Sequence, residues 1–185
     1  TSFMSAGVAD ADKTRLEGTN PYWRLVLSHE WGAHNIMIGT SGMVADVYDD
    51  PLDTSNPATV HRFRDIGIDS QYQYLLDPHT VTVQLAYMRD HHELPAFLAN
   101  QPIEDVNGNA LPNTNATDTT NVFRAKASYV YEARYGTSVS FFNQTGTTDS
   151  ALYDPTRVGG NIPGIPAVRG HTFEVFWTPV QYVRL

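Results

Sequence analysis

The chain contains no cysteine among its 185 residues. This absence excludes disulfides, thiolate zinc sites, iron–sulfur clusters and covalently attached c-type haem within the chain. Basic residues are also scarce, with 12 Lys and Arg against 20 Asp and Glu, which gives a formal net charge of −8. We therefore do not expect nucleic acid as a partner, because a phosphate-binding face needs clustered Lys and Arg.

Long hydrophobic stretches are missing as well. No apolar run reaches the roughly 18 residues that a membrane-spanning helix needs. The first residues, TSFMSAGVADADKTRLEG, lack the basic start and apolar core of a signal peptide. The chain starts at Thr1 in polar sequence and stops at Leu185 inside the apolar run VQYVRL. We expect residues 1–185 to form a single segment of a longer chain.

The sequence does contain apolar residues with a period of two, the pattern of β-strands with one apolar face. The alternation is clear in YWRLVLSHEW, DIGIDSQYQYLL, TVTVQLAYM and VFRAKASYVYE, and less regular in TSVSFFNQ and TFEVFW. The stretch NIMIGTSGMVADVY is apolar on both sides, so its facing is ambiguous. We predict an all-β chain with strands of roughly 9–11 residues.

Turn signals between these stretches alternate between short and long. Short turns are predicted at WGAHN, LDPHT, EARYG and TPVQ, where Gly32, Pro78, Gly136 and Pro179 interrupt the strand pattern. Long polar connections run from about residue 49 to 62, from 90 to 121 and from 145 to 170. The alternation predicts antiparallel strands arranged as consecutive β-hairpins that long loops connect.

Two architectures fit this pattern. A soluble β-sandwich packs the apolar face inward, whereas a transmembrane barrel turns it toward lipid. Strand length, alternating turn length and aromatic residues at strand ends favour the membrane barrel, because aromatic girdles lie at the membrane–water interface. We predict an antiparallel up-and-down transmembrane β-barrel wall of about seven to eight strands of a larger barrel, with short periplasmic turns and long extracellular loops. The predicted interface aromatics are Trp23, Trp31, Tyr72, Tyr74, Tyr87, Tyr129, Tyr131 and Trp177.

Four segments resemble Gram-negative outer-membrane porin-like β-barrels: NPYWRLVLSHEWGAHNIMIGT, FRDIGIDSQYQYLLDPHTVTVQLAYMRD, NVFRAKASYVYEARYGTSVSFFN and FEVFWTPVQYVRL. They are most similar to the large barrels of porin–cytochrome systems, in which a barrel sheathes a multihaem c-type cytochrome for extracellular electron transfer. The resemblance implies a location in the bacterial outer membrane and a barrel with more strands than this chain holds. The remaining strands, or other chains, must close it, because open sheet edges are not stable in lipid.

The polar residues that alternate with the apolar ones are expected to face the barrel lumen. In a channel, rings of such groups set ion preference, and around a partner protein they make polar contacts with it. The alternative position is the solvated outer face of a soluble sandwich. The predicted lumen-facing polar residues are Arg24, Glu30, Asp65, Asp69, Gln71, Gln73, Arg124, Lys126, Glu132 and Glu174.

The stretch HEWGAH, residues 29–34, is one residue longer than the HExxH of helical zinc proteases. Its period-two surroundings predict a strand end, with His29 and Trp31 on one side, Glu30 on the other and His34 in the turn. We expect no metal site there. The stretch RDHHE, residues 89–93, is interpreted as an exposed loop base, with metal binding or contact with a haem edge as the alternative.

Carboxylates in the stretch DVYDDPLD are candidate cation ligands, because calcium prefers oxygen ligands. A solvated acidic loop is the alternative interpretation. The candidate ligands are Asp46, Asp49, Asp50 and Asp53.

No Ser-His-Asp order, glycine-rich phosphate loop or spaced carboxylate pair stands out, so we expect neither enzymatic activity nor a cofactor. The expected function is passive, as a porin-like channel or as a sheath for a multihaem cytochrome conduit, with outer-membrane lipid around it. The alternatives are a secreted or periplasmic β-sandwich that binds a ligand or polymer through its long loops, and an adhesion or receptor surface built on those loops.

Overall fold

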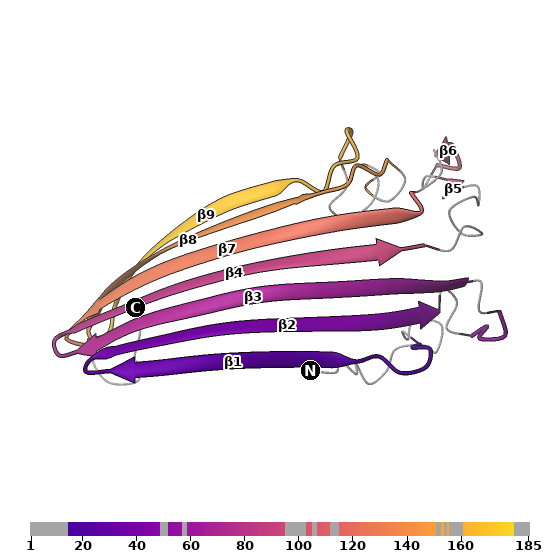
Figure 1. Ribbon diagram of the computed structural model, residues 1–185. Helices are drawn as coiled ribbons and strands as arrows, with labels where there is room; N and C mark the ends of the chain where they lie inside the picture. Colours follow the sequence, from indigo (N-terminus) through magenta and orange to yellow (C-terminus); the bar gives the residue numbers. More distant parts are fainter. Residues whose placement is uncertain are drawn as a thin grey trace.

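A computed structural model describes residues 15–48, 52–56, 59–94, 103–104, 107–111, 115–150, 153, 155 and 161–179. Within these residues, seven antiparallel strands form one sheet in the order β1-β2-β3-β4-β7-β8-β9 (Figure 1). The strands are β1 (Tyr22–Trp31), β2 (His34–Tyr48), β3 (Val60–Leu76), β4 (His79–Glu93), β7 (Thr117–Tyr131), β8 (Tyr135–Gly146) and β9 (Val168–Trp177). The predicted all-β, up-and-down antiparallel arrangement is therefore confirmed.

A second, two-stranded sheet lies in the connection between β4 and β7. It consists of β5 (Ile103–Glu104) and β6 (Ala110–Leu111), and the described part of its turn contains Gly108 with a positive φ of 81°. None of the described residues belongs to a helix long and apolar enough to cross a membrane.

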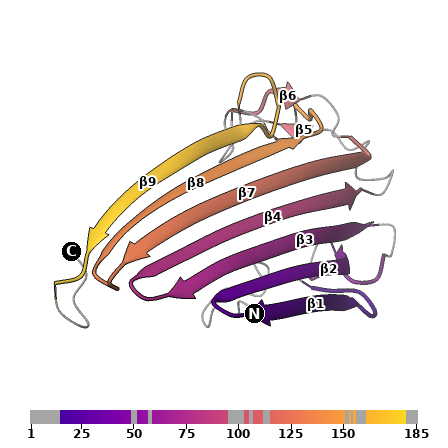
Figure 2. The same ribbon diagram turned by 60° about the vertical axis from the view of Figure 1, so that its left-hand side comes forward.

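Three short turns lie together at one end of the sheet, and the strand ends that lead into the long connections lie at the other (Figure 2). Residues 32–33 join β1 to β2, residues 77–78 join β3 to β4, and residues 132–134 join β7 to β8. Gly32 has a φ of 56° at the first of two turn positions, which is the requirement of a type II′ hairpin turn. The short turns predicted at WGAHN, LDPHT and EARYG are confirmed, but Gly136 lies within β8, because Glu132 and Ala133 supply the positive φ angles of the last turn.

The strands extend further toward the long connections than the sequence pattern predicted. β2, β4 and β7 each have 15 residues and β3 has 17. The predicted loop at residues 49–62 therefore ends inside β3, and the predicted loops at 90–121 and 145–170 begin and end inside strands. The apolar alternation stops before the strands do. Backbone pairing continues beyond it, because ladder hydrogen bonds need only adjacent N–H and C=O groups.

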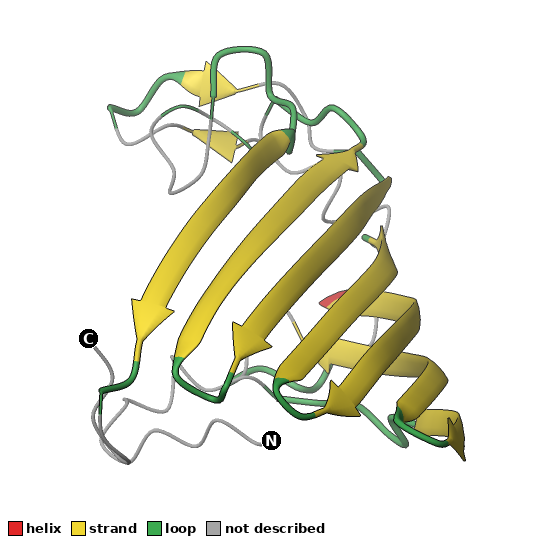
Figure 3. Cartoon of the chain, turned by 90° about the vertical axis from the view of Figure 1, so that its left-hand side faces the viewer, coloured by secondary structure: helices red, strands yellow, loops and turns green. Residues whose placement is uncertain are grey.

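The seven long strands form a single open layer, with β1 and β9 at its edges (Figure 3). No large side chain in this part of the chain is fully buried, and Ala45 is its one buried hydrophobic residue. A β-sandwich requires two sheets that bury their apolar faces against each other. The described strands alone do not form one.

The ambiguous stretch in β2 is explained by what crosses over it. A Cβ atom at Gly42 would lie only 2.4 Å from Nε1 of Trp23, because the indole of β1 lies across β2 at this position. On the other face a Cβ atom at Gly39 would lie 3.1 Å from Nη2 of Arg24. The small residues of β2 therefore accommodate side chains from β1 on both faces.

Candidate functional site

The cross-strand register separates the sheet into an apolar face and a polar face. Alternate residues of a strand point to opposite sides, and directly paired residues share a side. The apolar face can be followed from strand to strand through direct pairs. One such row starts at His29 and continues through Ile36, Tyr72, Val83, Ala127, Val139 and Phe173.

The apolar face is open to the surroundings along its whole width. The exposed fractions of Leu27 on β1 and Phe173 on β9, 71% and 70%, show this at opposite edges. Ile68 and Leu85 are also exposed in the middle of the sheet. The face therefore lacks a covering layer among the described residues.

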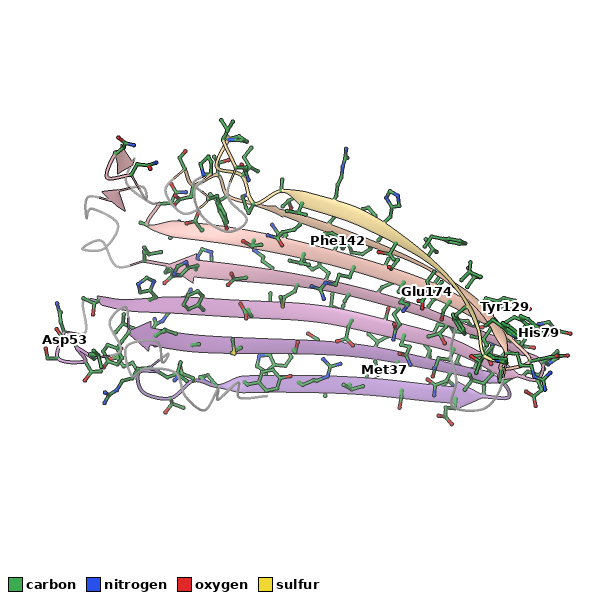
Figure 4. All side chains as sticks on the ribbon, turned by 180° about the vertical axis from the view of Figure 1, so that it is seen from behind. Met37, Asp53, His79, Tyr129, Phe142 and Glu174 are labelled. Atoms are coloured by element: carbon green, nitrogen blue, oxygen red, sulfur yellow. The ribbon has the colours of Figure 1, made fainter. Side chains whose placement is uncertain are left out.

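Aromatic rings form a row on the apolar face at the short-turn end, which we call the lower aromatic row. Figure 4 shows His79 and Tyr129 at this end and Asp53 at the opposite one. The lower aromatic row consists of Trp31, His34, Tyr72, Tyr74, His79, Tyr129, Tyr131, Tyr135 and Trp177. All of the predicted interface aromatics except Trp23 and Tyr87 lie in this row. The sequence interpretation missed its other three members, His34, His79 and Tyr135.

Two histidines of the lower aromatic row, His34 and His79, are each hydrogen-bonded to a tyrosine of the same row. His34 Nδ1 and the Tyr72 hydroxyl are hydrogen-bonded at 2.7 Å, and His79 Nδ1 and the Tyr129 hydroxyl at 2.8 Å. The prediction that His34 lies in the turn is wrong, because His34 opens β2 and pairs with Trp31. Their rings stack with centroids 5.3 Å apart. HEWGAH is thus a hairpin end with stacked rings.

A second aromatic row on the apolar face contains Trp23, Tyr87 and Phe123, and we call it the upper aromatic row. The Tyr87 hydroxyl donates a hydrogen bond of 2.8 Å to Asn121 Oδ1. On β1, β4 and β7 the two rows are about eight residue steps apart, or about 26 Å along the strand. In a barrel whose strands tilt by about 40°, this spacing would correspond to a height of about 20 Å, and the apolar band of outer-membrane barrels is about 25 Å tall.

Nine of the ten residues predicted to face a lumen share the polar face. The tenth, Glu132, lies in the turn after β7 with a φ of 51°, so it belongs to neither face. The sequence alternation continued one step too far, because β7 ends at Tyr131. The residues on the polar face are Arg24, Glu30, Asp65, Asp69, Gln71, Gln73, Arg124, Lys126 and Glu174.

Hydrogen bonds between strands organise the polar face. Arg24 Nη2 donates to Asp69 Oδ2 at 2.9 Å and reaches over Gly39 to do so. Further along the sheet, Gln84 Nε2 donates to Gln71 Oε1 at 2.8 Å. Such pairs hold polar side chains against the wall.

A hollow of about 580 Å³ lies in the middle of the polar face. Arg124 and Lys126 project from β7 at this hollow, and neither forms an ion pair with another described residue. Asp69, which also lines it, is already bound to Arg24. The hollow therefore combines apolar lining residues such as Met37 and Phe142 with two positive charges that no described residue neutralises.

The polar face carries a second group of charges toward the long loops, above the level of the upper aromatic row. Asp65 and Asp90 are directly opposite each other on β3 and β4. Burial, a hydrogen bond with Asp65 and repulsion from its charge raise the pKa of Asp90 to about 6. Beside them His92 stacks on Phe63 with ring centroids 4.2 Å apart, and burial together with the neighbouring histidines lowers the pKa of His92 to about 4.

The RDHHE stretch is part of strand β4, and the prediction of a loop base is wrong. Its two histidines point to opposite faces, as adjacent strand residues must. His91 contacts Thr119 Oγ1 at 3.1 Å on one face, whereas His92 lies 3.0 Å from His61 Nδ1 on the other.

Replacement of Asp90 by asparagine is expected to stabilise the protein at neutral pH. Between about pH 4 and 6 the Asp90 carboxyl keeps its proton in the folded state but loses it in the unfolded state. The stability that the carboxyl contributes is therefore lost as pH rises through 6. We expect Asp90→Asn to raise the free energy of unfolding at pH 7.5 by about 1 kcal/mol, allowing for solvent screening, and to change nothing at pH 4 or below.

Denaturant titrations of the wild type and Asp90→Asn across this pH range measure the effect. Because the pKa of His92 is lowered in the folded state, His92 destabilises the fold as pH falls from 6 to 4. In the wild type the raised pKa of Asp90 offsets this loss. The stability of Asp90→Asn should therefore fall more steeply over this range than that of the wild type. Parallel curves for the two proteins would contradict the assignment.

The two candidate cation ligands that the structure describes, Asp46 and Asp53, are each engaged by another residue. Both oxygens of Asp46 accept hydrogen bonds from Arg62, at 2.7 and 2.8 Å, and this guanidinium lowers the pKa of Asp46. Asp53 accepts bonds from the Ser55 backbone N–H and hydroxyl, while Asp49 and Asp50 lie outside the described residues. In the described ranges no group of three or more His, Asp or Glu side chains is arranged to hold a metal ion.

The sheet therefore offers an exposed apolar band between two aromatic rows and, behind it, a polar wall with a basic hollow. Comparison with known protein families, with curated proteins and with solved structures gave no match.

Proposed function

We propose that this sheet is part of the wall of a transmembrane β-barrel in a bacterial outer membrane, where it forms a passive, porin-like channel. The observation that carries the proposal is the apolar face, which is exposed over all seven strands. The lower aromatic row bounds it at the short-turn end, and the aromatics of the upper row bound it on β1, β4 and β7. Lipid is the surrounding that stabilises such a band, because aromatic rings with a polar edge prefer the membrane–water interface.

An aqueous surrounding does not suit this face. Soluble monomers rarely expose contiguous apolar patches of more than a few hundred Å². Here Leu25, Ile68, Val139 and Phe173, from four different strands, are each more than half exposed. A soluble sandwich would have to cover all of them with a second sheet from outside the described residues.

The polar face is proposed to line the lumen. Its residues pair with one another across strands, as Arg24 does with Asp69 and Gln84 with Gln71. The proposed role of this wall is to let polar solutes pass. Closure requires further strands at the β1 and β9 edges, from the same chain or from others.

The resemblance to porin–cytochrome barrels supports a second form of the same proposal, in which the lumen encloses a multihaem cytochrome. In that form Arg124 and Lys126 would contact acidic groups of the enclosed protein. The barrel wall is the same in both forms, and only the lumen content differs.

Conductance of the intact protein in planar bilayers tests the proposal. We expect stepwise, voltage-independent currents once it inserts. A membrane-bound protein that does not conduct and co-purifies with a multihaem cytochrome supports the sheath form instead. Recovery of the intact protein in detergent-free soluble extract, with no insertion into vesicles, contradicts both.

A further inference from the structure

Charged side chains gather on the apolar face beyond the upper aromatic row, on the side of the long loops. Cross-strand pairing places Arg62 opposite Glu93, Arg64 opposite His91 and Ile66 opposite Arg89, while Asp46 of β2 pairs with Arg62. We call this group the basic cluster; it consists of Asp46, Arg62, Arg64, Arg89, His91 and Glu93.

The partners within the basic cluster leave part of its positive charge available. Asp46 engages Arg62 through both carboxylate oxygens. Glu93 is shared, with Oε1 at 3.0 Å from Arg64 Nη1 and 3.4 Å from His91 Nε2. Arg89 has no ion pair with any other residue in the described part of the chain. Within the cluster three arginines therefore face two carboxylates, and Glu93 divides its charge between two partners. Outside the cluster the charge of Glu17 acts on Arg62.

A hollow of about 370 Å³ lies between the available cations. Arg64, Arg89 and His91 line it together with Asp65, whose side chain belongs to the polar face, and Ile66 forms its apolar wall. The wall continues toward the membrane band, because Ile68 and Tyr87 are the next residues on the same face of β3 and β4. The hollow thus has a cationic end beside the long loops and an apolar end beside the upper aromatic row.

This position matches the level of lipid headgroups in the proposed barrel. Arg89 is two residues beyond Tyr87, or about 7 Å along the strand, and tyrosine at the end of an apolar band marks the interface. Guanidinium groups bind phosphate through charge-assisted hydrogen bonds, and a pair of them surrounds a phosphate from two sides.

We propose that Arg64 and Arg89 bind the phosphate of an acylated lipid headgroup in the leaflet on the long-loop side, with an acyl chain along Ile66 and Ile68. The inference rests on the proposed function, because only a membrane-inserted barrel presents this face to lipid. A lipid accounts for the site better than free phosphate does, because the hollow opens directly onto the apolar band. Arg62, already bound twice by Asp46, holds the edge of the site and does not contact the lipid.

Retention of a phosphorylated lipid by the purified intact protein tests this assignment. The protein is reconstituted in phosphatidylcholine nanodiscs doped with lipid A, and bound lipid is counted by native mass spectrometry. We expect the double variant Arg64→Gln/Arg89→Gln to weaken lipid A retention about 30-fold. Each cation near a membrane surface raises the affinity by slightly more than about fivefold, and two such factors multiply. Arg169→Gln, which removes a cation from the same face on β9, should leave retention unchanged.

Two further arms separate the possible outcomes. Enzymatically dephosphorylated lipid A should be retained as weakly by the wild type as lipid A is by the double variant. Equal retention of lipid A by the wild type and the double variant overturns the inference, as does saturation of the site by inorganic phosphate alone. Conductance and heat-modifiable gel mobility are recorded on the same samples. An inserted, conducting protein without lipid A selectivity refutes the lipid site alone, whereas failure to insert refutes the barrel.

Discussion

The substitution Val83→Arg is expected to lower the free energy of unfolding of the intact protein in lipid vesicles by about 2–4 kcal/mol. Val83 is midway between His79 in the lower aromatic row and Tyr87 in the upper one, on the apolar face. A guanidinium there would lie at the middle of the proposed apolar band. The cost is large because no aqueous phase is within easy reach of the side chain at this depth.

The matched control is Thr82→Arg, one residue earlier and on the polar face. Thr82 pairs with Gln73 and Ser128, so its side chain points to the proposed lumen, and arginine there should change stability by about 0–1 kcal/mol. Urea unfolding of both variants in vesicles, followed by tryptophan fluorescence, measures the difference. Similar losses at 82 and 83 would show that the two faces meet the same surroundings.

Reversal of charge at the hollow of the polar face is expected to change ion preference severalfold. Arg124 and Lys126 are the basic groups there without an ion-pair partner among the described residues. Arg124→Glu/Lys126→Glu changes the local charge by four, and charge rings on a lumen wall govern which ions pass. The reversal potential under a salt gradient should move toward that of a cation-selective pore.

The control for this variant is Arg169→Glu, a charge reversal on the opposite face of the sheet. It should leave the reversal potential where the wild type has it. An unchanged reversal potential in the Arg124→Glu/Lys126→Glu protein would mean that these side chains do not line the conducting path.

The assignment of faces could be predicted from sequence alone because it depends only on a period of two. Once Leu25 and Leu27 are set on one side, Arg24 and Glu30 must take the other, and the register extends this from strand to strand. The same rule failed at Glu132, because periodicity does not reveal where pairing gives way to a turn. It also missed the ends of β3 and β4, where pairing continues through polar residues.

The structure of β2 shows a second limit of sequence reasoning. The small residues of β2 made its two faces look alike in the sequence. They are small because side chains of β1 extend over them, Trp23 over Gly42 and Arg24 over Gly39. The basic cluster was likewise divided between stretches that looked separate. Arg64 and Arg89 are 25 positions apart in the chain and come together only through the β3–β4 register. The small residues of β2 and the basic cluster are both explained by contacts between neighbouring strands. The pattern of a single strand carries no information about such contacts.

In the proposed barrel the apolar face meets lipid and the polar face meets water. The absence of cysteine makes a direct measurement possible, because single cysteines at positions 82–86 of the intact protein can each carry a spin label. In native outer-membrane vesicles we predict that labels at 83 and 85 collide with dissolved oxygen, and that labels at 82, 84 and 86 collide with a water-soluble nickel complex. Labels at 83 and 85 that are shielded from both reagents, or open to nickel, would contradict the account.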